Sequence, residues 1–165
     1  MNTLMDRTFR LLYPVNRWMY RGGHPNALAR WLNRLGALQY AKGLLSPSYA
    51  VTLHVKGRTS GRTISFPLVM VERDGEQYLV SMLGNDVNWV RNVRADGGRA
   101  VLERGTRRNV VLQDVDVALR APILRHYLAV APGGRAHIPI DWRAPVADFE
   151  RVADQYPVLR VKPAE

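Results

Sequence analysis

The sequence predicts an α+β fold: a small closed or split barrel of about six mainly antiparallel strands, with connecting helices and an N-terminal helical segment. Three observations favour it. The chain has 165 residues, 47% of them hydrophobic, so it can bury one core but not two large ones. Short segments with apolar residues at every second position follow one another through tight turns. Helical segments do not alternate regularly with these strands, which argues against a parallel sheet.

Residues 1–48 are expected to form a basic, amphipathic helical segment in front of the barrel. They carry seven Lys and Arg residues and one Asp, a net charge of +6. Apolar side chains recur there at helical spacing: Leu28, Trp31, Leu32, Leu35 and Leu38. Two interpretations stay open. The helix packs its apolar stripe on the domain behind it, or it makes a peripheral contact with an anionic membrane surface.

The barrel is predicted to occupy residues 49–165. Apolar and polar residues alternate in 51–55, which is typical of a half-buried strand. Residues 63–72 form the next strand, in which Pro67 marks an edge or a bulge because proline cannot donate to a ladder. An Asp-Gly pair then predicts a hairpin leading to a third strand at 77–83.

The second half of the barrel domain contains helices between strands. Asp86 is expected to cap a short helix, which two consecutive glycines end. Pro122 must lie in the first turn of its helix or kink it. After the short helix, the remaining elements are expected in this order: strands at 99–104 and 107–115, helices at 117–130 and near 146–155, and a strand at 156–161.

The composition excludes several classes of function. Without Cys there are no disulfides, thiolate metal sites or cysteine nucleophiles. The four His residues share no metal-ligand spacing, so no metal site is expected. There is no phosphate-binding loop of the nucleotide-binding type and no dinucleotide fingerprint. No segment has the pattern of a membrane span or a secretory signal, so a cytoplasmic protein is expected.

The turn at 56–62 is the candidate binding site. Its glycines expose backbone N–H groups, and its side chains supply hydroxyl and cationic donors within seven residues. The residues that carry this prediction are Lys56, Arg58, Thr59, Ser60, Gly61 and Arg62. Phosphate or carboxylate is the natural ligand of such a turn, although basic turns are also common on surfaces that bind nothing.

The order of motifs resembles the deazaflavin-dependent nitroreductase family, which uses coenzyme F420 and is also called the F420H2-dependent quinone reductases. The resemblance covers roughly residues 49–161. It is carried by Gly57-Arg58-x-Ser60-Gly61, Pro67-Leu68, Asp74-Gly75, Gly84, Asn88-Trp89-x-x-Asn92 and the closing Tyr156-Pro157-Val158.

The resemblance implies a split β-barrel of the flavin-binding type. The deazaflavin ring would lie in a groove, and basic residues would hold its phosphate and oligoglutamate tail. Reduced F420 would pass hydride to a quinone or nitro compound. By the same resemblance the cofactor-binding residues are those of the turn, together with Pro67, Ser81, Met82, Leu83, Gly84 and Trp89.

Individual roles and other functions stay open. Trp89 would stack near the ring or anchor its helix in the core. His126 and Tyr127 would donate a proton to the acceptor or have core and surface roles. A non-catalytic or FMN-binding relative of the same barrel is the alternative function. Nucleic-acid binding, suggested by a pI near 10.6, is disfavoured because no recognition motif accompanies the charge. A homodimer is expected by analogy, and a location at the inner face of the membrane is the alternative to a purely cytoplasmic one.

Overall fold

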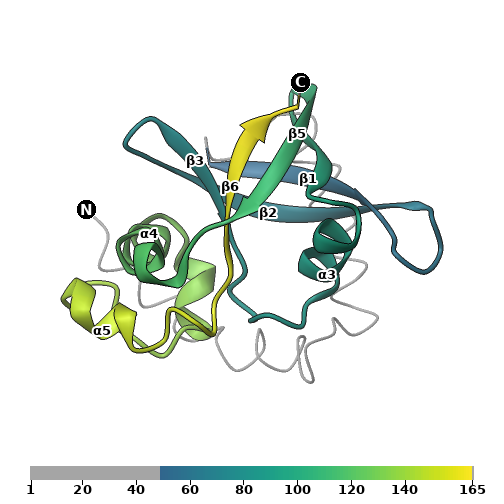
Figure 1. Cartoon of the computed structure of the whole chain (residues 1–165). Helices are drawn as coiled ribbons and strands as arrows, with labels where there is room; N and C mark the ends of the chain where they lie inside the picture. Colours follow the sequence, from purple (N-terminus) through teal and green to yellow (C-terminus); the bar gives the residue numbers. More distant parts are fainter. Residues whose placement is uncertain (1–48, 165) are drawn as a thin grey trace.

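The computed structural model describes residues 49–164, so the predicted helical segment at 1–48 lies outside the described residues. Figure 1 shows the arrangement of the helices and strands. In chain order these are β1 (Ala50–Lys56), β2 (Thr63–Arg73), β3 (Glu76–Val80), α3 (Asn88–Ala95), β4 (Arg99–Arg104), β5 (Thr106–Asp114), α4 (Val117–Val130), the 3-10 helix η2 (Pro132–Ala136), α5 (Val146–Glu150) and β6 (Val158–Pro163). Apart from η2, this is the predicted order for this part of the chain.

The strands close into a barrel. Their order around it is β1-β2-β3-β6-β5-β4, and β4 pairs back onto β1. Every pair is antiparallel. The last strand completes the barrel, because β6 pairs with β3 on one side and with β5 on the other. The predicted barrel of six antiparallel strands is therefore confirmed, and it is closed.

The alternation along the strands directs every second side chain into the barrel. Leu53, Leu79 and Leu102 come from β1, β3 and β4, and each is at most 2% exposed. Helix α3 adds Trp89 and Val90 to the same cluster. Full burial of one such side chain contributes about 1.5–3 kcal/mol relative to its exposure. A register shift of one residue would expose this entire face, so the interior fixes the pairing of the strands.

A second core covers the outer wall of the barrel. Tyr78 of β3 and Val158 of β6 belong to one buried cluster with Leu124 of α4 and Phe149 of α5. Figure 1 shows α4 and α5 on one side of the barrel, whereas the turn between β1 and β2 projects on the side of α3. The predicted binding turn is therefore separate from this helical layer.

Several predicted boundaries are wrong. Strand β3 ends at Val80 rather than at residue 83. Continuing the β3–β6 register places Ser81 opposite Pro157, which accepts the Ser81 N–H at 2.9 Å but has no N–H to donate in return. The last helix is shorter than expected, and the last strand begins two residues later. Pro122 lies inside α4, beyond its first turn, where it removes one backbone donor.

The predicted cap of α3 is also wrong. Val87 is the N-cap residue and provides no side-chain hydrogen bond. The Asp86 carboxylate instead accepts a hydrogen bond from Arg91 at 2.7 Å. The side chain of Arg91, on α3 itself, has thus replaced the helix backbone as the hydrogen-bond partner of this carboxylate.

Candidate functional site

The turn between β1 and β2 is closed by its own backbone. The Gly57 N–H donates to the Arg62 carbonyl at 2.8 Å, and the Gly61 N–H donates to the Gly57 carbonyl at 2.7 Å. Gly61 has φ +65°, which other residues rarely adopt. A Cβ on Gly57 would lie 2.7 Å from the Ser60 hydroxyl oxygen and 3.2 Å from the Arg62 carbonyl oxygen, so a side chain there would crowd the turn. Both glycines favour this geometry.

Arg58 is held against α3. Its Nη1 donates to Asn92 Oδ1 at 2.8 Å, and its backbone N–H reaches the same oxygen at 3.3 Å. Both Nη1 and Nη2 lie 3.3 Å from Asn88 Oδ1. These partners are neutral amides, so the guanidinium is oriented while its positive charge is not cancelled.

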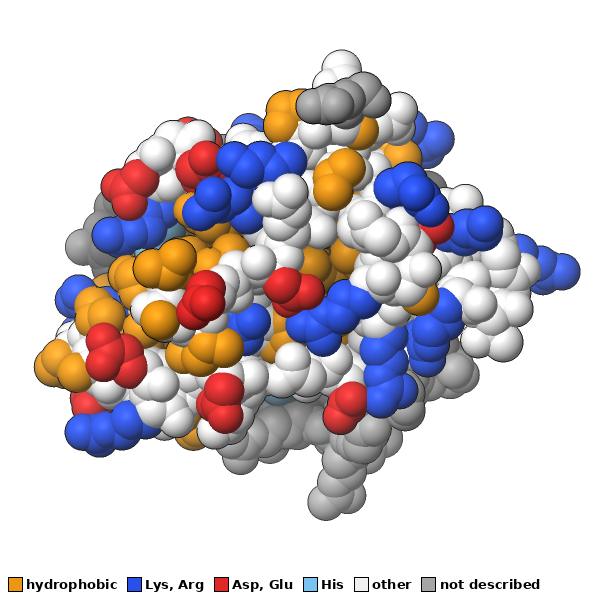
Figure 2. Space-filling view, viewed as in Figure 1, with side chains coloured by type: hydrophobic (Ala, Val, Ile, Leu, Met, Phe, Trp, Pro, Cys, Tyr) orange, Lys and Arg blue, Asp and Glu red, His pale blue; other side chains and the backbone are white. Residues whose placement is uncertain are grey.

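The other donors of the turn are exposed. Ser60 accepts a hydrogen bond from the backbone N–H of Arg62 at 3.3 Å, which turns its hydroxyl inward. Thr59 and Arg62 are exposed, and between residues 49 and 164 the Arg62 side chain has no ion pair. Two guanidinium groups, one oriented and one open to solvent, therefore lie within one turn. Figure 2 shows Lys and Arg side chains gathered on the side of α3 and this turn, with acidic side chains among them.

Pro67 lies in a stretch of β2 that is paired on one edge only, the edge facing β1. Residues 63–69 of β2 pair with β1, but pairing with β3 begins only at Met70. The predicted edge position of Pro67 is thus confirmed. Phe66 and Leu68 on this stretch, and Leu83 from the loop after β3, are partly buried against the barrel interior. An apolar strip beside an open strand edge adjoins the cationic turn.

Ser81, Met82 and Gly84 make contacts within the protein. The Ser81 hydroxyl donates to the Gly84 carbonyl at 2.6 Å, and this side chain is 1% exposed. Met82 Sδ accepts from the Tyr127 hydroxyl at 3.4 Å. Gly84 has φ +92°, which lets the loop turn back. These three residues shape the segment that leads into α3.

Trp89 and Tyr127 are core residues. Trp89 is 6% exposed inside the barrel cluster, as expected for a residue that anchors α3. Tyr127 is 4% exposed in the second core, and burial raises its pKa far above the ordinary value. A hydroxyl so hard to ionise is a poor proton donor. His126, the residue before it on α4, is only partly buried.

Asn88 and Asn92 were missing from the predicted site. They lie four residues apart on α3 and so occupy one face of the helix, which is the signal that the sequence carries. Both are neutral, and their shared hydrogen-bond partner, Arg58, precedes them by 30 and 34 residues in the chain. Only the fold brings the three residues together.

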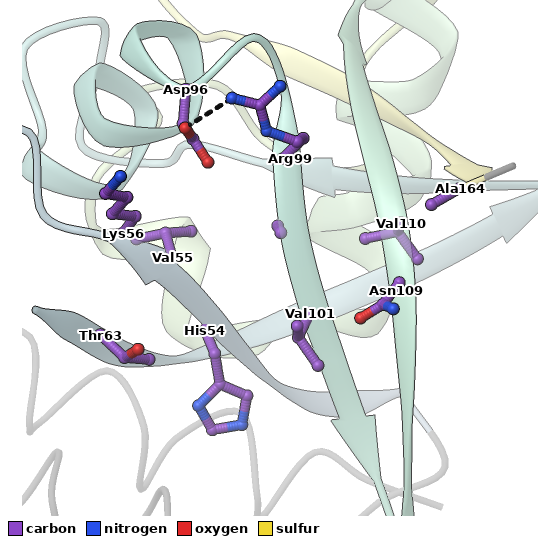
Figure 3. Close-up of a pocket in the computed structure, with 11 residues that line it drawn as sticks. His54, Val55, Lys56, Thr63, Asp96, Arg99, Val101, Asn109, Val110 and Ala164 are labelled. Atoms are coloured by element: carbon purple, nitrogen blue, oxygen red, sulfur yellow. Dashed lines mark hydrogen bonds and ion pairs between the residues drawn. The ribbon is translucent and has the colours of Figure 1, made fainter. Parts of the chain in front are cut away.

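A hollow of about 340 Å³ lies at the base of the turn, on the outer wall of the barrel (Figure 3). Lys56 and Thr63, the paired residues that end β1 and begin β2, line it. Arg99 also lines it and donates to Asp96 at 2.9 Å. The sequence placed Lys56 in the binding turn; the structure places its side chain on this outer wall.

His54 lines the same hollow and is bonded through both ring nitrogens. Nδ1 lies 2.7 Å from the Ser65 hydroxyl oxygen, and Nε2 lies 2.7 Å from a Glu103 carboxylate oxygen. Burial raises the pKa of Glu103, but hydrogen bonds from His54 and Arg107 outweigh it, so the pKa lies below the ordinary value. The network of His54, Ser65, Glu103 and Arg107 links four strands, β1, β2, β4 and β5. In the described part of the chain, no cluster of His, Asp and Glu could hold a metal ion.

Comparison with known proteins identifies a family for this chain. A family model described as F420H(2)-dependent quinone reductase matches residues 36–139, more than half of the chain. No curated protein matches. A solved F420-H2 dependent reductase is 20% identical, with 70% of this chain and 95% of that chain covered and a TM-score of 0.48.

Two further solved structures match the chain at lower identity. A protein of unknown function from Agrobacterium tumefaciens is 15% identical, covering 80% of this chain and 55% of that chain, with a TM-score of 0.53. A FAD-binding protein from Mesorhizobium loti is 12% identical, covering 79% and 89%, with a TM-score of 0.46. At these identities the likeness concerns the fold alone.

Proposed function

Because the chain belongs to the F420H(2)-dependent quinone reductase family, we propose that it binds F420 at the β1–β2 turn and that hydride passes from the reduced deazaflavin to a quinone. A nitro compound is the alternative acceptor. The observation that carries the proposal is Arg58, whose guanidinium is fixed by Asn88 and Asn92 without a neutralising carboxylate.

The turn suits the anionic part of F420. Phosphate and carboxylate oxygens accept hydrogen bonds from guanidinium groups and from exposed backbone N–H groups. Arg58 and Arg62 supply the first kind of donor, and the hydroxyl of Thr59 supplies another. The donor set is cationic and rich in N–H and O–H groups, which is the chemistry that such an anion requires.

The strand edge beside the turn suits the ring. Residues 63–69 of β2 present unpaired backbone groups next to the side chains of Phe66, Leu68 and Leu83. A planar heteroaromatic ring needs both an apolar surface and in-plane hydrogen-bond partners. Pro67 lacks an N–H and therefore contributes only its carbonyl to this edge.

The protein's own contribution to the reaction is binding and orientation. When bound, F420 supplies the hydride chemistry, so no nucleophile is required of the chain. Arg58 and Arg62 would fix the charged end, and the rigid loop formed by Ser81 and Gly84 would limit water beside the strand edge. Tyr127 takes no part in proton transfer in this account, because its hydroxyl is buried against Met82.

A fluorescence titration with F420 tests the proposal. We expect micromolar or tighter binding by the wild type, and about 10- to 100-fold weaker binding after Arg58→Ala or Arg62→Ala, since a hydrogen bond to a charged group contributes about 1.5–3 kcal/mol. Arg104→Ala is the matched control: Arg104 is exposed at the opposite end of β4, about 17 Å from Arg99.

Turnover is measured as oxidation of F420H2 with menadione or with a nitroaromatic compound as acceptor. Unchanged F420 fluorescence across the micromolar range would contradict the proposal. A yellow preparation that absorbs near 450 nm would indicate the FMN-binding alternative. Binding without turnover would indicate a non-catalytic relative.

We also propose that residues 1–48 contact a membrane surface and that the chain forms a homodimer. Quinones of the bilayer are lipid-soluble, and residues 1–48 carry a net charge of +6 that suits anionic lipid. Between residues 49 and 164 no helix has the length and apolar character of a membrane span. Co-sedimentation of the full chain with anionic but not with neutral vesicles would support the contact, and light scattering would report a homodimer.

A further inference from the structure

We propose that Asn88 and Asn92 are positioning residues that hold the anion-binding guanidinium of Arg58 while leaving its charge available. The inference rests on the proposed function of the turn. It assigns to two neutral side chains a role that carboxylates, the commoner partners of arginine, could not fulfil.

The bonding of Asn92 is the first line of support. Its side chain is 2% exposed, and a buried amide is costly unless its polar atoms are bonded. Its Oδ1 accepts from both the backbone N–H and the Nη1 of Arg58. One atom thus orients the main chain and the side chain of the same residue, at the start of the turn.

The neighbouring arginines are the second line of support. Three other arginines lie on α3 or directly after it, and each is paired with a carboxylate at 2.7–2.9 Å: Arg91 with Asp86, Arg94 with Asp114 and Arg99 with Asp96. The hydrogen bond from Arg94 is the main reason why the pKa of Asp114 is lowered. Arg58 differs from all three, because amide oxygens hold it.

The difference matters for an incoming anion. A carboxylate bonded to Arg58 would repel the phosphate or carboxylate of a ligand. It would also neutralise the positive charge of the guanidinium group. An amide oxygen fixes the same geometry with only a dipole. Arg58 therefore meets its ligand already ordered, which lowers the entropy cost of binding.

Nearly isosteric variants that introduce a negative charge give the sharpest test. Asn88→Asp and Asn92→Asp retain an oxygen at each position, so Arg58 stays in place while a negative charge cancels its own. We expect at least a tenfold loss of F420 affinity in each variant, with a shallower dependence of affinity on salt. Asn88 begins α3, where a carboxylate favours the helix, so Asn88→Asp should keep or raise the unfolding temperature as affinity falls.

Asn109→Asp is the matched control. Asn109 is exposed on β5, and the register places it opposite Val101 of β4, which in turn lies opposite His54 of β1. Asn109 lines the hollow on the outer wall (Figure 3), and two strand spacings and the residues from His54 to Arg58 separate it from the Arg58 guanidinium. We expect Asn109→Asp to leave F420 affinity within twofold of the wild type.

A measurement without cofactor tests the positioning itself. In NMR spectra the guanidinium protons of Arg58, assigned by their loss in Arg58→Ala, should exchange slowly with solvent in the wild type and in Asn92→Asp. In Asn92→Ala they should exchange at least tenfold faster, because the shortest of their bonds is gone.

The outcomes separate this inference from the proposed function. Wild-type affinity in both Asp variants, combined with a loss in Arg58→Ala, would overturn the positioning role while the F420 site stood. Equal proton exchange in Asn92→Ala and the wild type would overturn it as well. If the wild type does not bind F420, the proposed function fails. If Asn92→Asp does not fold, Asn88→Asp decides, because Asn88 is exposed.

Discussion

Replacement of Gly57 by Ala tests whether the shape of the turn, and not only its charge, determines binding. The added Cβ would lie 2.7 Å from the Ser60 hydroxyl oxygen, 3.0 Å from Ile64 Cδ1 and 3.2 Å from the Arg62 carbonyl oxygen. The first two side chains can rotate away. The carbonyl cannot, because it accepts the N–H of Gly57 and closes the turn. The backbone must therefore open by a few tenths of an ångström.

The cost follows from this geometry. Overpacking of a well-packed site costs about 1–3 kcal/mol, and each kcal/mol lowers the unfolding temperature by roughly 2–4 °C for a chain of this size. Arg58 follows Gly57 directly, so the displacement also moves its backbone N–H away from Asn92. We expect F420 affinity to fall by about tenfold, equivalent to about 1.4 kcal/mol.

Gly134→Ala provides the control for instability alone. Its Cβ would lie 2.6 Å from the Tyr127 ring, in the second core and away from the turn. Differential scanning fluorimetry and F420 titration are measured on both variants. Both should melt earlier, and only Gly57→Ala should lose affinity. Wild-type affinity in Gly57→Ala, or an equal loss in Gly134→Ala, would refute the reasoning.

Three further predictions concern residues away from the turn. Tyr127→Phe should leave turnover within twofold and stability within about 1 kcal/mol, because only a weak bond to sulfur is lost; a large loss of kcat would show that Tyr127 is a proton donor after all. Trp89→Ala should cost about 3–5 kcal/mol in the free energy of unfolding, measured with urea, since it empties a site in the barrel core; a cost below about 1 kcal/mol would place the ring outside that core. The lowered pKa of Glu103 means that its bonds to His54 and Arg107 stabilise the fold at neutral pH and are lost as acid protonates the carboxylate. Glu103→Gln should therefore flatten the fall of the unfolding temperature below about pH 5, and parallel profiles for variant and wild type would contradict this.

The alternation of apolar residues predicted most of the barrel because each strand has one face inside it. Leu53 and Leu102 lie opposite each other on β1 and β4, and both fill the interior. The errors fall where other groups of the folded chain compete for a residue. Asp86 is a residue type that favours the helix N-cap but bonds to the Arg91 side chain instead. The end of β3 at Val80 depends on Pro157, which is 77 residues further on.

The sequence indicated the charges of the candidate site but not the arrangement of its residues. Arg58, Ser60 and Gly61 were proposed because their donors suit an anion and because they match the family's turn, and their role in binding stays a prediction. Asn88 and Asn92 entered only as part of the family motif, because the spacing of two asparagines on one helix face does not identify a partner 30 and 34 residues earlier in the chain. Lys56 was assigned to the turn, yet its position in β1 directs it to the outer wall beside Thr63.

A positive net charge alone does not select an anion site in this protein. With 24 Lys and Arg against 14 Asp and Glu, the composition predicts attraction of anions in general, nucleic acid included. Around α3 the carboxylates of Asp86, Asp96 and Asp114 occupy the arginines that such a broad surface would use. What remains is Arg58, oriented by amides, with Arg62 beside it. In the part of the chain that the structure describes, these two guanidinium groups in one turn suit the compact anion of a cofactor better than the extended backbone of a polynucleotide, which requires a row of unpaired cations.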